Sequence, residues 1–155
     1  MVLTFCVEFE QEPFTIWQNS AKNPFAVLMV PAEETLHILL RDLTESAIRK
    51  QIENEGKSDL SDIQKLASDW IAIEEAIVGS ITYNLLPRFL EAHIDNLPPS
   101  LMEKDLESRK HFKQYRYLSM AIELVNRMGY RKILTIYREE PSRFKAILKT
   151  HSTQG

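Results

Sequence analysis

Residues 63–81 read IQKLASDWIAIEEAIVGSI, and this stretch decides the fold class. Large apolar side chains recur there at steps of three or four residues, at Ile63, Leu66, Trp70, Ile73, Ile77 and Ile81. That spacing places them on one side of an α-helix, and polar residues fall mostly off the stripe, among them Asp62, Lys65, Asp69 and Glu75. The pattern predicts a long helix with a buried face, weakened or kinked at its far end by Gly79-Ser80 and Pro87.

A second helical pattern precedes this stretch. Pro31 suits a first helical turn, and apolar residues then repeat at helical spacing until Gly56 ends the pattern. Ser58 is the expected N-cap of the helix that follows.

Further helices are predicted downstream. Ser100 and Glu103 match a capping box, so we expect one long helix from there to residue 128, with Gly129 as its left-handed terminator. Its apolar face, with Leu118, Ile122 and Val125, is expected to pack on the stripe of residues 63–81. Residues 131–137 fit a strand or a helix, and a last short helix begins at Pro141-Ser142.

The N-terminal residues favour β-structure instead. Residues 3–9 alternate apolar and polar side chains, residues 14–17 could return as a second strand, and residues 25–30 form a continuous apolar run. We therefore expect a mainly α (α+β) fold in a single domain, residues 1–155. A small antiparallel β element (residues 1–30) would pack on a bundle of four to five helices (residues 31–150).

Composition sets limits on location and chemistry. The 155 residues are 44% hydrophobic and 26% charged, as in ordinary globular chains. Cys6 is the single cysteine, so an internal disulfide and a cysteine-based metal site are excluded. The chain starts without the cationic region of a signal peptide and has no apolar run of membrane-spanning length. We expect an intracellular protein, cytoplasmic or nuclear, that does not contact a membrane.

Charge is divided unevenly along the chain. Residues 1–102 hold 16 acidic and 7 basic residues, a balance of −9, whereas residues 103–155 hold 6 acidic and 12 basic residues, a balance of +6. Such asymmetry indicates either a basic surface for an anionic partner or two halves that attract each other.

The basic segment 109–117 is the main candidate contact surface. On one continuous helix Arg109, Lys113 and Arg116 would share a face that could follow a phosphate backbone, with Tyr117 as a stacking ring. The full candidate set for nucleic acid or an acidic partner is Arg109, Lys110, Lys113, Arg116, Arg131, Lys132 and Lys145. The interpretation we favour is that these residues are solvated or pair with the acidic half, for example with Glu74, Glu75 or Asp95.

Metal and catalytic sites are weakly indicated. Glu34 and His37 have the spacing of a di-metal unit, and Glu107 and His111 lie one turn apart, but a di-metal bundle needs two such units and two further glutamates. The histidines could act as bases, yet none lies in a motif that positions it. We expect no catalytic residues, cofactor or metal.

The sequence therefore predicts a non-catalytic interaction module or a subunit of a multiprotein assembly, with a protein partner or homo-oligomerisation. Trp17, beside polar Gln18 and Asn19, is the candidate anchor for a protein partner. The alternative is a nucleic-acid-binding protein that uses residues 103–149.

Overall fold

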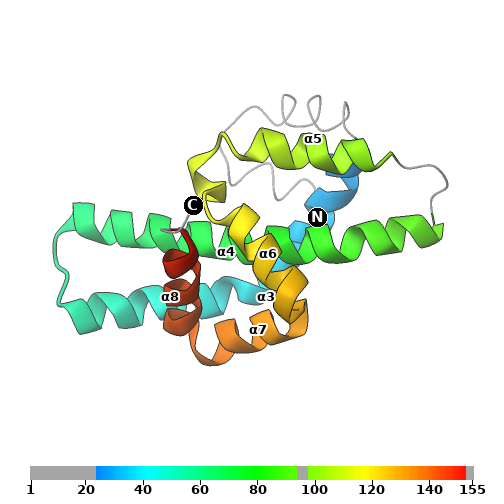
Figure 1. Ribbon diagram of the computed structural model, residues 1–155. Coiled ribbons are helices and arrows are strands. Elements are labelled where there is room, and N and C mark those ends of the chain that lie inside the picture. The colour runs from blue at the N-terminus through cyan, green and yellow to red at the C-terminus, as the bar shows by residue number, and fades with distance from the viewer. Residues whose placement is uncertain (1–23, 94–97, 153–155) are drawn as a thin grey trace.

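The computed structural model describes residues 24–93 and 98–152, and its regular structure there is helical (Figure 1). Six α-helices and one 3-10 turn follow in the order α3 (Pro24–Glu55), α4 (Leu60–His93), α5 (Pro99–Arg109), η1 (Lys113–Tyr115), α6 (Leu118–Met128), α7 (Tyr130–Glu139) and α8 (Pro141–Ser152). The mainly helical class is confirmed for these residues, with more helices than expected. None of the described helices is long and apolar enough to cross a membrane.

Helices α3 and α4 form a long antiparallel hairpin, across which α6, α7 and α8 pack (Figure 1). The turn falls at Gly56, where φ of +59° favours a residue without a side chain. The N-cap prediction of Ser58 is wrong, because α4 begins at Leu60 and the residue before it is Asp59. Asp59 Oδ1 accepts the backbone N–H groups of Ser61 at 2.8 Å and Asp62 at 3.3 Å.

The strand expected over residues 25–30 is also wrong, because α3 already begins at Pro24. A continuous apolar run does not distinguish a buried strand from a buried helix, and here the run places Met29 in the core with no exposed surface. Pro31 therefore lies inside α3 rather than at its start. The strands expected over residues 3–9 and 14–17 lie outside the described residues.

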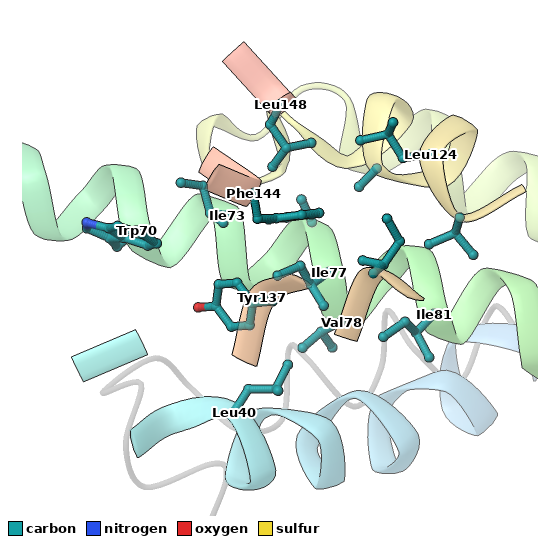
Figure 2. Packing of buried hydrophobic residues seen from close by; sticks show 14 of the residues in the cluster. Leu40, Trp70, Ile73, Ile77, Val78, Ile81, Leu124, Tyr137, Phe144 and Leu148 are labelled. Atoms are coloured by element: carbon teal, nitrogen blue, oxygen red, sulfur yellow. The ribbon is translucent and has the colours of Figure 1, made fainter. Parts of the chain in front are cut away.

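The stripe on α4 forms the centre of the core (Figure 2). Leu66, Trp70, Ile73, Ile77 and Ile81 are buried, as predicted, whereas Ile63 is only half-buried. Helix α6 packs along α4 and buries Leu118 and Val125, while Ile122 stays half-buried. An added Cβ at Gly79 would lie 2.6 Å from Leu118 Cδ1, so the glycine permits this close approach of the two helices.

The single helix predicted from Ser100 to residue 128 is wrong. Helix α5 ends at Arg109, and the chain turns through η1 before α6 begins at Leu118. On the two sides of the break, Arg109 pairs with Glu33 on α3 and Arg116 pairs with Asp69 on α4. Ser100 is not the N-cap either, because α5 begins at Pro99, whose ring suits the first helical position, with Pro98 before it.

The C-terminal helices close the core. Residues 130–139 are helical, which resolves the ambiguity over 131–137, and Gly129 separates α6 from α7 with φ of +83°. Tyr137 and Phe144 are fully buried and meet edge to face at 5.8 Å between ring centroids. The Tyr137 hydroxyl lies 2.6 Å from Thr44 Oγ1, which ties α7 to α3.

Candidate anion-binding cleft

Asp69 is the centre of a polar cluster that joins α4, α8 and the segment around η1. Its Oδ1 accepts hydrogen bonds from Arg116 at 3.0 Å and from the Tyr117 hydroxyl at 2.8 Å. Its Oδ2 is paired with the ammonium groups of Lys145 at 2.9 Å and Lys149 at 2.8 Å. We call these five residues the Asp69 cluster, in which three cations surround one carboxylate.

The fold holds the Asp69 cluster in place through its neighbours. Trp70, the next residue after Asp69, is fully buried and donates its indole N–H to Gln51 Oε1 at 2.8 Å. Lys145 donates to the same Gln51 oxygen at 3.0 Å and lies 4.6 Å from the Trp70 ring centroid. The side chain of Lys145 is therefore fixed by a carboxylate, an amide and an aromatic face at once.

The side chain of Arg116 is also held by several contacts, as that of Lys145 is. Its guanidinium donates to the backbone oxygens of Lys113 at 3.0 Å and Ser68 at 3.3 Å, in addition to Asp69. It also lies 4.9 Å from the ring centroid of Tyr117. The turn at η1 brings Arg116 to this position, since the carbonyl of Lys113 belongs to that turn.

These contacts shift the protonation equilibria. Burial alone would raise the pKa of Asp69, but hydrogen bonds from Lys149, Lys145, Tyr117 and Arg116 hold it well below its usual range. Burial lowers the pKa of Lys145, and the nearby Lys149 lowers it further, whereas Asp69 acts in the opposite direction. Asp69 is therefore a stable anion, and the cations around it repel one another.

An open cleft of about 770 Å³ lies over the Asp69 cluster. Residues near the end of the α3–α4 hairpin, on and beside η1, and on α8 supply its walls. Positive side chains line it in excess: the cations are Lys57, Lys65, Lys113, Arg116, Lys145 and Lys149, and the carboxylates are Glu55 and Asp69. We call this the basic cleft, whose lining has a formal charge of +4 from six cations and two carboxylates.

The structure brings three of the seven candidate cations to this cleft, namely Lys113, Arg116 and Lys145. Lys110 instead pairs with Glu107 at 2.6 Å, and Arg131 lies over the ring of Tyr130. Lys132 is exposed on α7. The candidate protein anchor Trp17 lies outside the described residues.

Arg109 is not on the exposed face that a continuous helix would give it. It is 8% exposed, and its guanidinium makes a bidentate pair with Glu33 on α3, at 2.8 and 2.9 Å. Its Nε donates to Asp105 at 2.9 Å, and Asp105 also accepts the Tyr83 hydroxyl. We call Glu33, Tyr83, Asp105 and Arg109 the Arg109 cluster. Burial opposes the charge of Arg109, but Glu33 holds the pKa of the guanidinium above its usual value.

The carboxylates suggested as partners of the basic segment have another role. Glu74 and Glu75 contact His37 on α3, with His37 Nδ1 at 2.7 Å from Glu74 and Nε2 at 3.6 Å from Glu75. Burial alone would lower the pKa of His37, but the two glutamates raise it to about 10. The other suggested partner, Asp95, lies outside the described residues. No group of three or more metal-ligating side chains is placed to hold a metal ion in the described residues.

Sequence reasoning missed Asp69 as the organising residue, and it did not select Lys57 or Lys65. Asp69 was read only as a polar position beside the apolar stripe. Its place next to the buried Trp70 was the one available signal, because a carboxylate at the edge of a core needs cationic or hydrogen-bonding partners.

Comparison of the chain with protein-family models, curated proteins and solved structures gave no match.

Proposed function

We propose that this chain is a non-catalytic interaction module that binds an acidic segment of a partner protein in the basic cleft. The excess of positive charge in that concave surface carries the proposal. The whole chain has a formal net charge of −3, so the positive potential is local to the cleft rather than a property of the whole surface.

The cations that line the basic cleft outnumber the carboxylates that pair with them within the chain. Lys57 pairs with Glu55 at 3.1 Å, and Lys65 pairs with Asp62 at 3.6 Å. Setting these two pairs and Lys149 aside leaves Lys113, Arg116 and Lys145 against the one carboxylate of Asp69. A partner that brings carboxylates would neutralise this remainder and would be steered to the cleft during encounter.

Three of the polar groups with the chemistry for catalysis are committed to internal contacts elsewhere in the described residues. His37 bridges α3 to two glutamates of α4, Arg109 holds α5 on α3, and Tyr137 ties α7 to Thr44. These bonds join helices that are distant in sequence. They support a structural role for these groups and a binding rather than a catalytic role for the chain.

Nucleic acid is the alternative occupant of the cleft. Binding to a single strand would draw much of its affinity from bases stacked on exposed rings. Tyr117, the ring considered for that role, donates its hydroxyl to Asp69 and is covered by Arg116. An acidic peptide needs only the cations and no free ring, so the contacts at Tyr117 favour the peptide.

The test is binding of a fluorescein-labelled nona-glutamate peptide at increasing salt, followed by fluorescence anisotropy. The cleft variant replaces three lysines that line the cleft around Asp69, Lys113→Gln, Lys145→Gln and Lys149→Gln. The matched control replaces three exposed lysines on α3, α5 and α7, Lys50→Gln, Lys104→Gln and Lys132→Gln, with the same change in net charge. We expect the cleft variant to lose most of the affinity and the control to retain it.

Two results would overturn the proposal. An equal loss in the cleft variant and in the matched control would mean that the peptide responds to overall charge and not to the cleft. Tighter binding of a random-sequence oligonucleotide at physiological salt, abolished in the cleft variant alone, would establish the nucleic-acid alternative.

A further inference from the structure

Two large aliphatic side chains are exposed on α4 beside the basic cleft. Leu60 is 70% exposed at the first position of the helix, and Ile71 is 51% exposed about three turns later. Single apolar residues are normal on a protein surface, so their exposure alone indicates no function. The placement of these two residues relative to the cleft is what distinguishes them. We call Leu60 and Ile71 the rim pair.

The rim pair shares a face of α4 with two polar residues that line the cleft. Gln64 and Ser68 are these lining residues, and positions 60, 64, 68 and 71 follow one another at steps of four, four and three. That spacing keeps the four side chains within about a quarter turn of the helix. Leu60 and Ile71 therefore lie at the two ends of one rim of the basic cleft.

A second pair of exposed aliphatic residues lacks this placement. Ile38 and Leu39 on α3 are comparably exposed, but no residue three or four positions from either of them lines the cleft. The pair on α3 therefore serves as a control for an effect of surface hydrophobicity alone.

The cations of the basic cleft reach the same stretch of α4. Arg116 donates to the backbone oxygen of Ser68 at 3.3 Å, and Lys65 is itself a lining residue. A segment that lay along this part of α4 would meet positive charge between two aliphatic side chains. A peptide can complement both features with carboxylates and aliphatic side chains, whereas a sugar–phosphate backbone complements the charge alone.

The separation of the rim pair sets the spacing that such a segment needs. Eleven helical positions separate Leu60 from Ile71, which is about 16 Å along the helix axis at about 1.5 Å per residue. An acidic run repels itself and favours an extended chain, in which about 16 Å corresponds to about five residues. The matching segment has an aliphatic residue at each end of a run of about four acidic residues.

We propose that the partner's acidic segment carries a large aliphatic side chain at each end of its acidic run, and that these two side chains pack on Leu60 and Ile71 while the carboxylates face the cations of the basic cleft. This inference rests on the proposed function, because it assumes that an acidic segment enters the cleft. It adds the two apolar contacts that select one acidic segment over another.

The test compares three fluorescein-labelled peptides of ten residues, each with eight glutamates and therefore the same charge. The first has leucines at its third and eighth positions, the second has serines there, and the third has its two leucines adjacent at the centre. We expect the first peptide to bind about tenfold more tightly than the serine peptide, because two leucines become partly buried. The peptide with adjacent leucines can reach only one rim residue and should bind with intermediate affinity.

The double variant Leu60→Gln/Ile71→Gln should remove the preference for leucine and retain the affinity for the serine peptide. The matched control Ile38→Gln/Leu39→Gln should retain both. All four positions are exposed and helical, and glutamine is a good helix former, so we expect both variants to fold.

Salt dependence gives a second readout. Binding of each peptide should weaken with salt, because carboxylates and cations are screened. The ratio of affinities between the spaced-leucine and serine peptides should stay near tenfold, because apolar contacts are not screened. A ratio that falls to one at high salt would overturn the apolar contacts.

The remaining outcomes separate the two proposals. Binding of none of the peptides would overturn the proposed function together with this inference. Equal binding of all three, abolished in the cleft variant, would leave the proposed function standing and overturn the role of the rim pair. A leucine preference that survives Leu60→Gln/Ile71→Gln, or that the control variant also loses, would overturn it as well.

Two other occupants of the rim pair can be recognised by measurements without peptide. Sedimentation that shows self-association of the wild type, abolished by Leu60→Gln/Ile71→Gln, would identify a second copy of the chain. Binding to phosphatidylserine vesicles that is abolished by the same variant would identify a lipid surface. Either result would overturn the assignment of the rim pair to an acidic segment.

Discussion

The Arg109 cluster and the Asp69 cluster use the same kinds of side chain in opposite proportions. In the Arg109 cluster one guanidinium lies between two carboxylates, and all three side chains are about 10% exposed. In the Asp69 cluster one carboxylate lies among three cations, of which Lys149 is 49% exposed. The first cluster is closed and holds helices together, whereas the second opens into a cleft and retains positive charge.

This difference accounts for the uneven charge of the sequence. Both clusters pair the basic C-terminal part with carboxylates on α3 or α4, so much of the asymmetry serves the attraction of the two halves. Complete pairing at Arg109 removes that cation from any surface role. At Asp69 one carboxylate is shared by Arg116, Lys145 and Lys149, and this cluster opens into the basic cleft.

Arg109→Met should give the largest loss of stability. The substitution would leave the Glu33 and Asp105 carboxylates buried without a cation, which costs about 3–5 kcal/mol of the free energy of unfolding at neutral pH. Urea unfolding followed by circular dichroism measures this loss. Lowering the pH should reduce it, because burial raises the pKa of Glu33 and its protonated carboxyl group no longer requires the cation.

Arg116→Met is the matched comparison in the open cluster. Asp69 would keep Lys145, Lys149 and Tyr117, so the expected loss is about 1 kcal/mol. Equal losses for the two arginine variants would show that the two clusters do not differ in structural importance.

Asp69→Asn should have an intermediate effect, of about 1–3 kcal/mol, because three cations would lose their shared anion. The low pKa of Asp69 in the folded chain means that its contribution to stability is present above the unfolded value, near 4, and is lost as the pH falls below it. The wild type should therefore lose more stability than Asp69→Asn between neutral pH and acid. Parallel pH profiles for the two proteins would contradict the role given to Asp69.

Sequence reasoning predicted the parts of this comparison that depend on local periodicity. The stripe from Ile63 to Ile81, the turn at Gly56 and the last helix from Pro141 follow from spacing and from turn-forming residues, and they are confirmed. Intramolecular pairing of the basic segment with the acidic half, which we favoured, is observed for Arg109 and Arg116, although with other carboxylates than those suggested.

The parts that failed depend on contacts between distant residues. The break after Arg109 is accompanied by a pair with Glu33, 76 positions earlier, and Asp69 meets Arg116 across 47 positions. The spacing of residue types along the sequence does not reveal contacts between residues so far apart. The end signals at Ser100 and Gly129 and the apolar spacing between them therefore favoured a continuous helix, which the structure does not have.

His37→Gln should show a pH-dependent effect. The pKa of His37 is about 10 in the folded chain, against 6.5 as its ordinary value. Its charge therefore stabilises the fold fully below pH 6.5, and this contribution is lost as the pH rises toward 10, by at most about 1.4 kcal/mol per pH unit. The difference in unfolding free energy between wild type and His37→Gln should shrink over that range, measured by urea titrations at several pH values. A constant difference would mean that His37 is uncharged at neutral pH.

Lys113→Gln should have the smallest effect on stability and still alter function. The side chain is exposed, and the contact of this residue with Arg116 uses its backbone oxygen, which the substitution retains. Stability should change by less than about 0.5 kcal/mol, while affinity for the nona-glutamate peptide falls severalfold because the substitution removes one positive charge from the cleft. Thermal unfolding and fluorescence anisotropy on the same preparation separate the two quantities. A variant that binds as well as the wild type would exclude the Lys113 side chain from recognition, whereas a loss of stability would mean that this side chain makes structural contacts.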